Sequence, residues 1–191
     1  MKEIFTDIYK NNNWKSEESV SGQGSTLDAT IGIRLALPKL FAKFHVKSVL
    51  DIPCGDLNWI TKVDFGDIKY IGADIVPELI AEMSVLHQAD LRVLDITMDE
   101  LPKVDLILVR DLFGHFSDVD LKLAIDNVKR SGSKYLLATT FPSTFNTIQI
   151  KTGQWRALNL DYYCGLPPAI EIINEGNQLF KDKCLGLWKL N

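Results

Sequence analysis

The chain has 191 residues, of which 46% are hydrophobic and 24% are charged, and its formal net charge at pH 7 is −4. This length is enough to bury one large hydrophobic core, and the composition is that of an ordinary soluble globular protein. The negative net charge argues against binding nucleic acid through a broad basic face.

Features that the sequence lacks exclude other classes. No apolar run approaches the ~20 residues that span a bilayer, and no apolar segment follows the first residues, as a secretory signal would require. The three cysteines, Cys54, Cys164 and Cys184, are widely spaced, which argues against a disulfide framework and a zinc site. We therefore expect a single domain, residues 1–191, in the reducing cytoplasm, with no metal.

Residues 1–44 are predicted to form an N-terminal helical segment that precedes a core of residues 45–191. Apolar side chains at positions 4, 5, 8 and 9 have helical spacing, and the asparagines at 11–13 are expected to end that helix. Ser21-Gly22-Gln23-Gly24-Ser25 has the composition of a flexible loop. A second helix is predicted from Thr26 to about Phe44, with a kink or a break at Pro38.

The motif that organises the core is a short buried strand, Val49 to Ile52, that runs into Pro53-Cys54-Gly55-Asp56. Open α/β sheets bind ligands at such strand–loop–helix turns, at the carboxyl ends of the strands. Gly55 lacks a Cβ, so its backbone can lie close to a ligand and adopt a positive φ. The amides that open the expected helix after this loop would face that ligand, although similar turns also occur without any ligand.

A second strand, Lys69 to Ile75, places the carboxylate of Asp74 19 residues after Gly55. In sheets that bind dinucleotides or nucleosides, an acid about 20 residues beyond the glycine loop accepts hydrogen bonds from the ribose hydroxyls. Strand end, spacing and charge therefore all favour a ribose-binding role for Asp74.

The later segments continue to alternate between strands and helices. Helices are predicted from Pro77 to about Leu86 and from Asp118 to Lys129, the latter with Ser117 as its N-cap, and strands over residues 90–96, 104–109 and 134–140. Only ten residues separate the last two apolar runs, 169–173 and 184–190, which suits an antiparallel hairpin. The predicted fold class is α/β, a Rossmann-like, doubly wound seven-stranded sheet, mostly parallel, with a C-terminal antiparallel hairpin.

This arrangement resembles the class I S-adenosylmethionine-dependent methyltransferases over roughly residues 45–190, on the residues Asp51 to Asp56, Asp74 and Asp95-Ile96. The chain is also similar to a smaller bacterial group of methyltransferases that often accompany glycan or capsule biosynthesis. The segments that carry this second similarity are 21–26, 51–59, 72–79, 110–111, 115, 140–142, 155–160 and 187–188. The chain departs from the superfamily loop of three glycines, because Pro53 and Leu57 occupy the first and third places.

The resemblance implies S-adenosylmethionine as the cofactor and suggests what each residue contacts. Asp51 and Gly55 would contact the methionine part, with the loop that begins at Ser21 closing over it, Asp74 would hold the ribose, and Asp95 would accept from the adenine amine with Ile96 against the ring. Plain turn acids, and for Asp56 a helix cap, are the alternatives. The full set of cofactor-binding candidates is Ser21, Gly22, Asp51, Pro53, Gly55, Asp56, Asp74, Ile75, Asp95, Ile96 and Arg110.

Chemistry beyond the cofactor is expected from the segment that follows the fourth strand. Methyl transfer from a sulfonium asks the protein mainly to position the acceptor and to remove its proton. His115 is the best candidate for that base, since a histidine can accept a proton near neutral pH, and Asp111 could orient it. A histidine that only lines the core is the alternative.

Trp155, Arg156 and Asn159 are the candidates for acceptor contacts, since they lie between the fifth strand and the hairpin. A guanidinium there could hold a phosphate or a carboxylate, whereas surface charge and a buried tryptophan are the plainer explanation. The predicted function is methyl transfer to an oxygen or nitrogen of a small polar, possibly anionic acceptor such as a sugar or glycan precursor. The alternatives are a nicotinamide-dependent oxidoreductase, for which a GxGxxG motif is missing and which would have a parallel sixth strand in place of the hairpin, and a non-catalytic cofactor-binding subunit. The sequence leaves the oligomeric state open.

Overall fold

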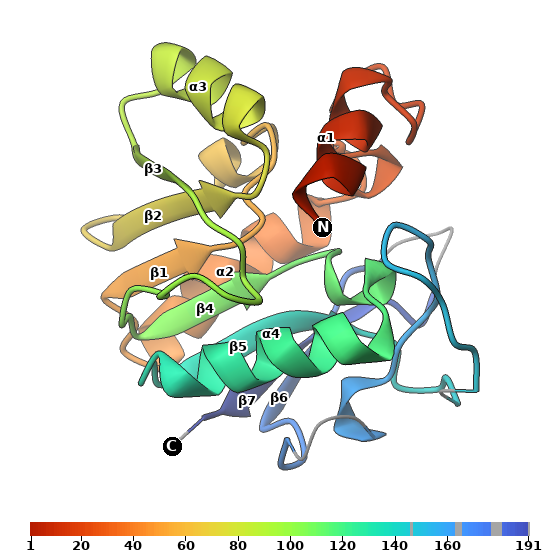
Figure 1. The fold of residues 1–191 in the computed structure, drawn as a ribbon. Coiled ribbons are helices and arrows are strands. Elements are labelled where there is room, and N and C mark those ends of the chain that lie inside the picture. Colours follow the sequence, from red (N-terminus) through yellow and green to blue (C-terminus); the bar gives the residue numbers. More distant parts are fainter. Residues whose placement is uncertain (146, 163–165, 177–180, 191) are drawn as a thin grey trace.

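The computed structural model describes residues 1–145, 147–162, 166–176 and 181–190, and Cys164 lies outside these ranges. Its centre is one seven-stranded sheet with the strand order β3-β2-β1-β4-β5-β7-β6 (Figure 1). The strands are β1 Ser48–Asp51, β2 Lys69–Asp74, β3 Asp90–Val93, β4 Leu106–Val109, β5 Tyr135–Thr140, β6 Glu171–Asn174 and β7 Cys184–Lys189.

The pairing confirms the predicted fold class. Strand β7 pairs antiparallel with both β5 and β6, and the other neighbouring strands pair in parallel. The chain order reverses between β1 and β4, and their carboxyl ends are therefore the place where an open α/β sheet binds its ligands. The C-terminal hairpin also counts against the oxidoreductase alternative, for which a parallel strand was expected there.

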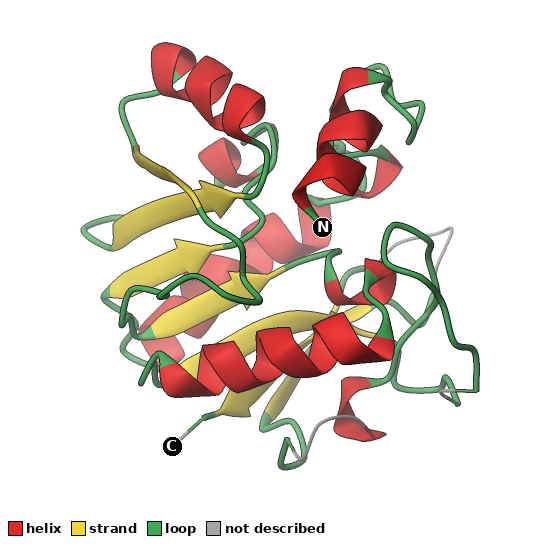
Figure 2. Cartoon of the chain, viewed as in Figure 1, coloured by secondary structure: helices red, strands yellow, loops and turns green. Residues whose placement is uncertain are grey.

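Four α-helices flank the sheet within the described ranges: α1 Lys2–Lys10, α2 Ile31–Lys43, α3 Pro77–Leu86 and α4 Asp118–Arg130 (Figure 2). Helix α4 crosses one face in front of β4 and β5, and α2 lies behind the other face. All four residues of β4 are buried, as expected for a central strand covered on both sides. Helix α1 stands beyond the edge toward which β1, β2 and β4 point.

The helix expected directly after the glycine loop is not formed, and that prediction was wrong. Only a short 3₁₀ turn, Ile60–Lys62, follows β1 before β2 begins. Gly55 and Leu57 both have positive φ, 56° and 57°, and left-handed residues interrupt the right-handed path that a helix requires. Leu57 thus takes the backbone conformation that the superfamily's third glycine would adopt easily.

The second predicted helix begins later than expected and is not broken. It starts at Ile31, because the threonines at 26 and 30 stabilise a separate turn: the Ala29 amide donates to Thr26 Oγ1, and Thr30 Oγ1 donates to the Thr26 carbonyl. Helix α2 then continues through Pro38 to Lys43. Its buried residues, Ile33, Leu37, Leu40 and Phe41, bind it to the core.

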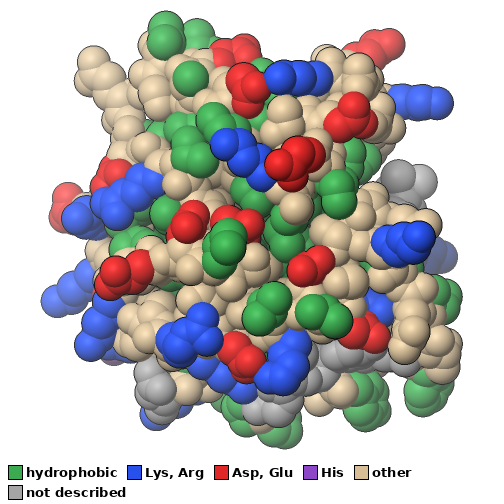
Figure 3. Space-filling model, viewed as in Figure 1, with side chains coloured by type: hydrophobic (Ala, Val, Ile, Leu, Met, Phe, Trp, Pro, Cys, Tyr) green, Lys and Arg blue, Asp and Glu red, His purple; other side chains and the backbone are tan. Residues whose placement is uncertain are grey.

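The helices and the charged surface of the described part bear on whether the protein could bind a membrane or a nucleic acid. No helix in it is both long and apolar enough to cross a bilayer. On the face shown in Figure 3, Lys and Arg side chains are interspersed with Asp and Glu. That face therefore lacks the continuous basic surface on which nucleic-acid backbones bind.

Candidate active site

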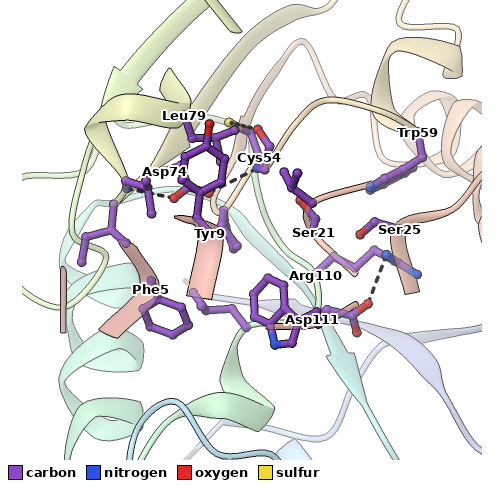
Figure 4. Close-up of a pocket in the computed structure, with 17 residues that line it drawn as sticks. Phe5, Tyr9, Ser21, Ser25, Cys54, Trp59, Asp74, Leu79, Arg110 and Asp111 are labelled. Carbon is purple, nitrogen blue, oxygen red and sulfur yellow. Dashed lines mark hydrogen bonds and ion pairs between the residues drawn. The ribbon is translucent and has the colours of Figure 1, made fainter. Parts of the chain in front are cut away.

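A cavity lies at the carboxyl ends of β1, β2 and β4 (Figure 4). Helix α1 and the loop after it form one wall, and the strand ends form the other. In Figure 4, Asp74 and the Arg110–Asp111 pair lie at opposite ends with Ser21 between them. The predicted cofactor residues that line it are Ser21, Pro53, Gly55, Asp74, Ile75 and Arg110.

Asp74 is buried at the end of β2. One carboxylate oxygen accepts a hydrogen bond from the Val76 amide at 3.0 Å, and the other accepts from the Gly55 amide at 3.3 Å. Burial raises the pKa of Asp74 to about 6, against the backbone hydrogen bonds, which lower it. Gly55 and Asp74, which are 19 residues apart in the sequence, are therefore in direct contact in the fold.

Asp51, at the end of β1, is buried and does not line the first cavity. The Tyr70 hydroxyl donates to its carboxylate at 2.8 Å. Burial raises the pKa of Asp51 to about 7, although Tyr70 and the charge of Arg110 act in the opposite direction. Any effect of this carboxyl on a ligand would be transmitted through its neighbours.

The glycine loop at Gly55 and Asp56 packs against the N-terminal loop, residues 19–21. A Cβ on Gly55 would overlap the Ser21 hydroxyl oxygen, so a larger residue cannot replace it without displacing Ser21. The Asp56 carboxylate accepts from Ser19 Oγ at 3.0 Å and from the Val20 amide at 2.9 Å. Asp56 does not line the cavity, and no α-helix begins directly after it for it to cap. It instead fixes the N-terminal loop, whose Val20 and Ser21 line the cavity.

Four charged side chains form a buried cluster beside the cavity: Arg110, Asp111, Glu175 and Lys183. Arg110 donates to the Glu175 carboxylate at 2.7 and 3.2 Å, and its guanidinium lies 3.1 Å from Asp111. Lys183 Nζ lies 2.6 Å from Asp111 and 3.3 Å from Glu175. The Glu175 side chain has no exposed surface, and that of Asp111 is 29% exposed.

Asp111 is held as an anion by this cluster. Burial alone would raise its pKa, but the adjacent Arg110 and Lys183 outweigh burial and keep the pKa well below its usual range. Its backbone has a φ of +56°, an uncommon conformation for a residue with a side chain. The Asp111 amide donates to Thr139 Oγ1 at 2.9 Å, which fixes the turn after β4.

A second, more open cavity adjoins the first. Gly22, Asp111, His115, Trp155, Glu175 and Lys183 are among its lining residues. The His115 ring donates from Nδ1 to the Gln154 carbonyl at 3.0 Å, and the Trp14 ring lies 5.5 Å from it, centre to centre. Burial lowers the pKa of His115, against the charge of Asp111, so the imidazole is neutral near pH 7.

A small apolar slot continues from the first cavity toward β3. It is lined by Ile75, Leu94, Ile96 and Leu112, with Phe5 of α1 above them. Asp95 does not line it: its carboxylate accepts from the Thr97 amide at 2.9 Å and from the Thr97 hydroxyl at 2.6 Å. This turn also ends β3 at Val93, three residues before the predicted end at Ile96.

The three predicted acceptor residues do not line the second cavity together. Trp155 lines the second cavity, is 47% exposed and stands edge-on to Phe141. Arg156 is buried, donates to the carbonyls of Ile148 and Phe116, and pairs with Asp118 at 2.7 Å. Asn159 is buried and donates to the Pro142 carbonyl at 2.7 Å. Among the residues of the described ranges, no cluster suited to a metal ion is found.

Sequence reasoning missed three groups of lining residues. Glu175 and Lys183 reach the site because β7 lies beside β5, a neighbour relation that the chain order does not reveal. Phe5 and Tyr9 were recognised only as one face of a helix, yet they cover the first cavity. Trp14 lines both cavities, and no local pattern distinguishes it from a core aromatic residue.

No protein-family profile and no curated protein sequence matches the chain, but solved structures resemble it. The match to human N-acetylserotonin methyltransferase in complex with SAM has 13% identity and a TM-score of 0.63, and covers 98% of this chain and 59% of that one. This chain thus spans about three fifths of that protein's length.

Two bacterial structures match over most of their own length. A 1,6-didemethyltoxoflavin N1-methyltransferase from Burkholderia thailandensis, with S-adenosylhomocysteine bound, has 12% identity and a TM-score of 0.67, with 98% of this chain and 86% of that chain covered. Magnesium protoporphyrin IX methyltransferase from Synechocystis PCC 6803, with bound SAM, has 15% identity and a TM-score of 0.60, with 98% and 96% covered. The chain therefore has the fold of these S-adenosylmethionine-dependent methyltransferases.

Proposed function

We propose that this protein is an S-adenosylmethionine-dependent methyltransferase that acts on a small polar acceptor. The observation that carries the proposal is the buried carboxylate of Asp74, which closes β2, contacts the Gly55 amide and faces the first cavity. A carboxylate in this place can accept hydrogen bonds from both hydroxyls of a ribose. The shared fold supports the same choice of cofactor.

The residues at the carboxyl edge of the sheet would contact each part of this cofactor in turn. Ile75, Ile96 and Leu112 of the apolar slot would lie against the adenine ring, and Asp74 would hold the ribose. Ser21, Gly55 and the turn at Arg110 would surround the methionine part. When bound there, S-adenosylmethionine would supply a methyl group activated by a positively charged sulfur.

The second cavity is the proposed acceptor site, and His115 is its proposed base. Its Nδ1 donates to the Gln154 carbonyl, which leaves Nε2 with a lone pair that can take a proton. The Asp111 carboxylate is engaged by Arg110 and Lys183, so the ring is oriented by Gln154 and Trp14. Asp111 then acts on His115 only through its negative charge, which raises the pKa of the imidazole against the effect of burial.

The acceptor class is proposed to be a sugar, glycan precursor or other small polar molecule that presents an oxygen or nitrogen. The rings of Trp155 and Phe141 offer apolar faces at this cavity. An anionic group would have to compete with Asp111 and Glu175 for Lys183. The arrangement therefore favours an acceptor that is uncharged where it meets the methyl group.

The location of the protein in the reducing cytoplasm also remains a proposal. Cys54 and Cys184 are free, buried thiols, as expected in a reducing compartment.

The negative net charge supports a small-molecule acceptor over nucleic acid.

Calorimetric titration with S-adenosylhomocysteine tests the cofactor assignment without any knowledge of the acceptor. We expect saturable binding to the wild-type protein and at least tenfold weaker binding to Asp74→Ala, because a hydrogen bond to a charged group is worth about 1.5–3 kcal/mol. Asp67→Ala, which removes an exposed carboxylate outside the cavity, is the matched control and should bind like wild type. The absence of heat at high micromolar ligand would reject the proposal.

A further inference from the structure

The two cavities adjoin at three side chains that belong to the lining of both, and we call this shared boundary the passage. Trp14, Ser21 and Asp111 are the residues that line both cavities. The passage thus combines an aromatic ring, a hydroxyl and a carboxylate. A methyl group that moves from the first cavity to the second must cross it.

Two contacts fix the position of Trp14 at this passage. Its ring packs against the His115 imidazole, 5.5 Å away and tilted by 41°. Gly22, with a φ of +92°, also packs on Trp14, since an added Cβ would lie 3.3 Å from Trp14 Cβ. The place of the indole is therefore set by the acceptor-side histidine and by the glycine-rich loop.

Asp111 supplies the charge at the same passage. Its side chain is the most exposed member of the buried cluster, and Arg110 and Lys183 keep it ionised. Glu175 contacts both of these cations and has no exposed surface. The two cations and the two carboxylates of the cluster sum to zero charge. Asp111 is the one of the four that lines both cavities, so it brings a carboxylate to the passage.

We propose that Trp14 and Asp111 recognise the positive sulfonium of the cofactor, so that the site distinguishes the methylated cofactor from its neutral thioether product. This inference rests on the proposed function and adds to it a specificity site that the sequence motifs do not include. The face of an indole attracts a cation within about 6 Å of its centre, and a carboxylate adds an opposite charge. Both attractions end once the methyl group leaves, because the sulfur is then uncharged.

The test is a pair of dissociation constants, for S-adenosylmethionine and S-adenosylhomocysteine, measured by calorimetry on each protein. For Trp14→Leu we expect the affinity for the sulfonium form to fall roughly five- to tenfold, the range for a partly buried cation–π contact, and the affinity for the thioether form to change less than about twofold. Asp111→Asn should shift the ratio in the same direction. Phe145→Leu, which removes an exposed aromatic residue that lines neither cavity, should leave the ratio unchanged.

The outcomes separate this inference from the proposed function. An equal loss of both affinities in Trp14→Leu, or no loss of either, would show that Trp14 is only a wall of the cavity and would overturn the inference. Failure of the wild-type protein to bind either compound would instead reject the proposed function. If circular dichroism shows that Trp14→Leu is unfolded, Asp111→Asn decides the question, because an equal change in both affinities would then overturn the inference. Trp14→Phe, which keeps an aromatic face, should preserve most of the ratio.

Discussion

Three carboxyl groups at the carboxyl edge of this sheet differ in ionisation because their neighbours differ. Asp51 has a tyrosine hydroxyl as its direct partner, Asp74 has backbone amides, and Asp111 has two cations. Burial raises the pKa values of Asp51 and Asp74 to about 7 and about 6, whereas the cations keep that of Asp111 low. One edge therefore holds two carboxyls that titrate toward neutral pH beside one that stays charged.

Asp51→Asn should flatten the dependence of stability on pH. The folded protein binds the Asp51 proton more tightly than the unfolded chain does, since the pKa rises from 3.8 to about 7. The stabilising contribution of this group is therefore complete below the unfolded value and is lost as the pH rises from 3.8 to about 7. At about 1.4 kcal/mol per pKa unit, the loss is at most about 4 kcal/mol.

Urea unfolding at pH 5 and pH 8 measures this effect. The free energy of unfolding of wild type should fall more between the two pH values than that of Asp51→Asn. The exposed-site variant Asp67→Asn should keep the wild-type dependence. Parallel pH dependences in wild type and Asp51→Asn would show that the Asp51 carboxyl is not buried as described.

At the scale of elements, the site is assembled from segments that lie far apart in the sequence. Asp56 holds the loop of Ser19 and Val20, and Arg110 donates to the Gly24 carbonyl at 2.8 Å. Tyr9 of α1 donates to Glu82 of α3 at 2.7 Å. Each contact brings part of the N-terminal segment to the strand ends, so the first cavity depends on residues 1–25 as much as on the sheet.

Glu175→Gln should destabilise the protein strongly, because Arg110 and Lys183 would lose one of their two shared carboxylates while remaining buried. Removing one partner of a buried ion pair costs about 3–5 kcal/mol. Glu171→Gln is the matched control: Glu171 begins β6, which ends one residue before Glu175, and it pairs with Lys43 at a partly exposed site, where the cost is about 0–1 kcal/mol.

Chemical denaturation of the two variants provides the comparison. A loss of more than about 2 kcal/mol for Glu175→Gln, with less than 1 kcal/mol for Glu171→Gln, is the expected result. Equal and small losses would mean that the hairpin is not tied to the site through this cluster.

For the whole molecule, the sequence predicted what depends on local pattern and spacing. The alternation of predicted strands and helices indicated the sheet and its hairpin, and the 19-residue spacing predicted that Asp74 lies near Gly55. The absent helix after the glycine loop could not be foreseen, because the left-handed conformation of Leu57 depends on tertiary packing that overrides local preference. The cluster around Glu175 depends on β7 inserting between β5 and β6, which no local pattern encodes.

The position of Arg156 is another feature that the sequence could not predict. Its charge suggested an acceptor contact, but a guanidinium can be used equally well for the fold, and here it holds Asp118 and two carbonyls. Sequence identifies residues that can do chemistry, whereas only the fold shows whether they reach the cavity.

The most direct test of this account is a crystal structure of the protein grown with S-adenosylhomocysteine. We predict electron density for the ligand in the first cavity, with the ribose hydroxyls within hydrogen-bond distance of Asp74 and the sulfur facing the passage of Trp14, Ser21 and Asp111. Density for the nucleoside at any other place, or a first cavity filled by side chains at saturating ligand, would contradict it.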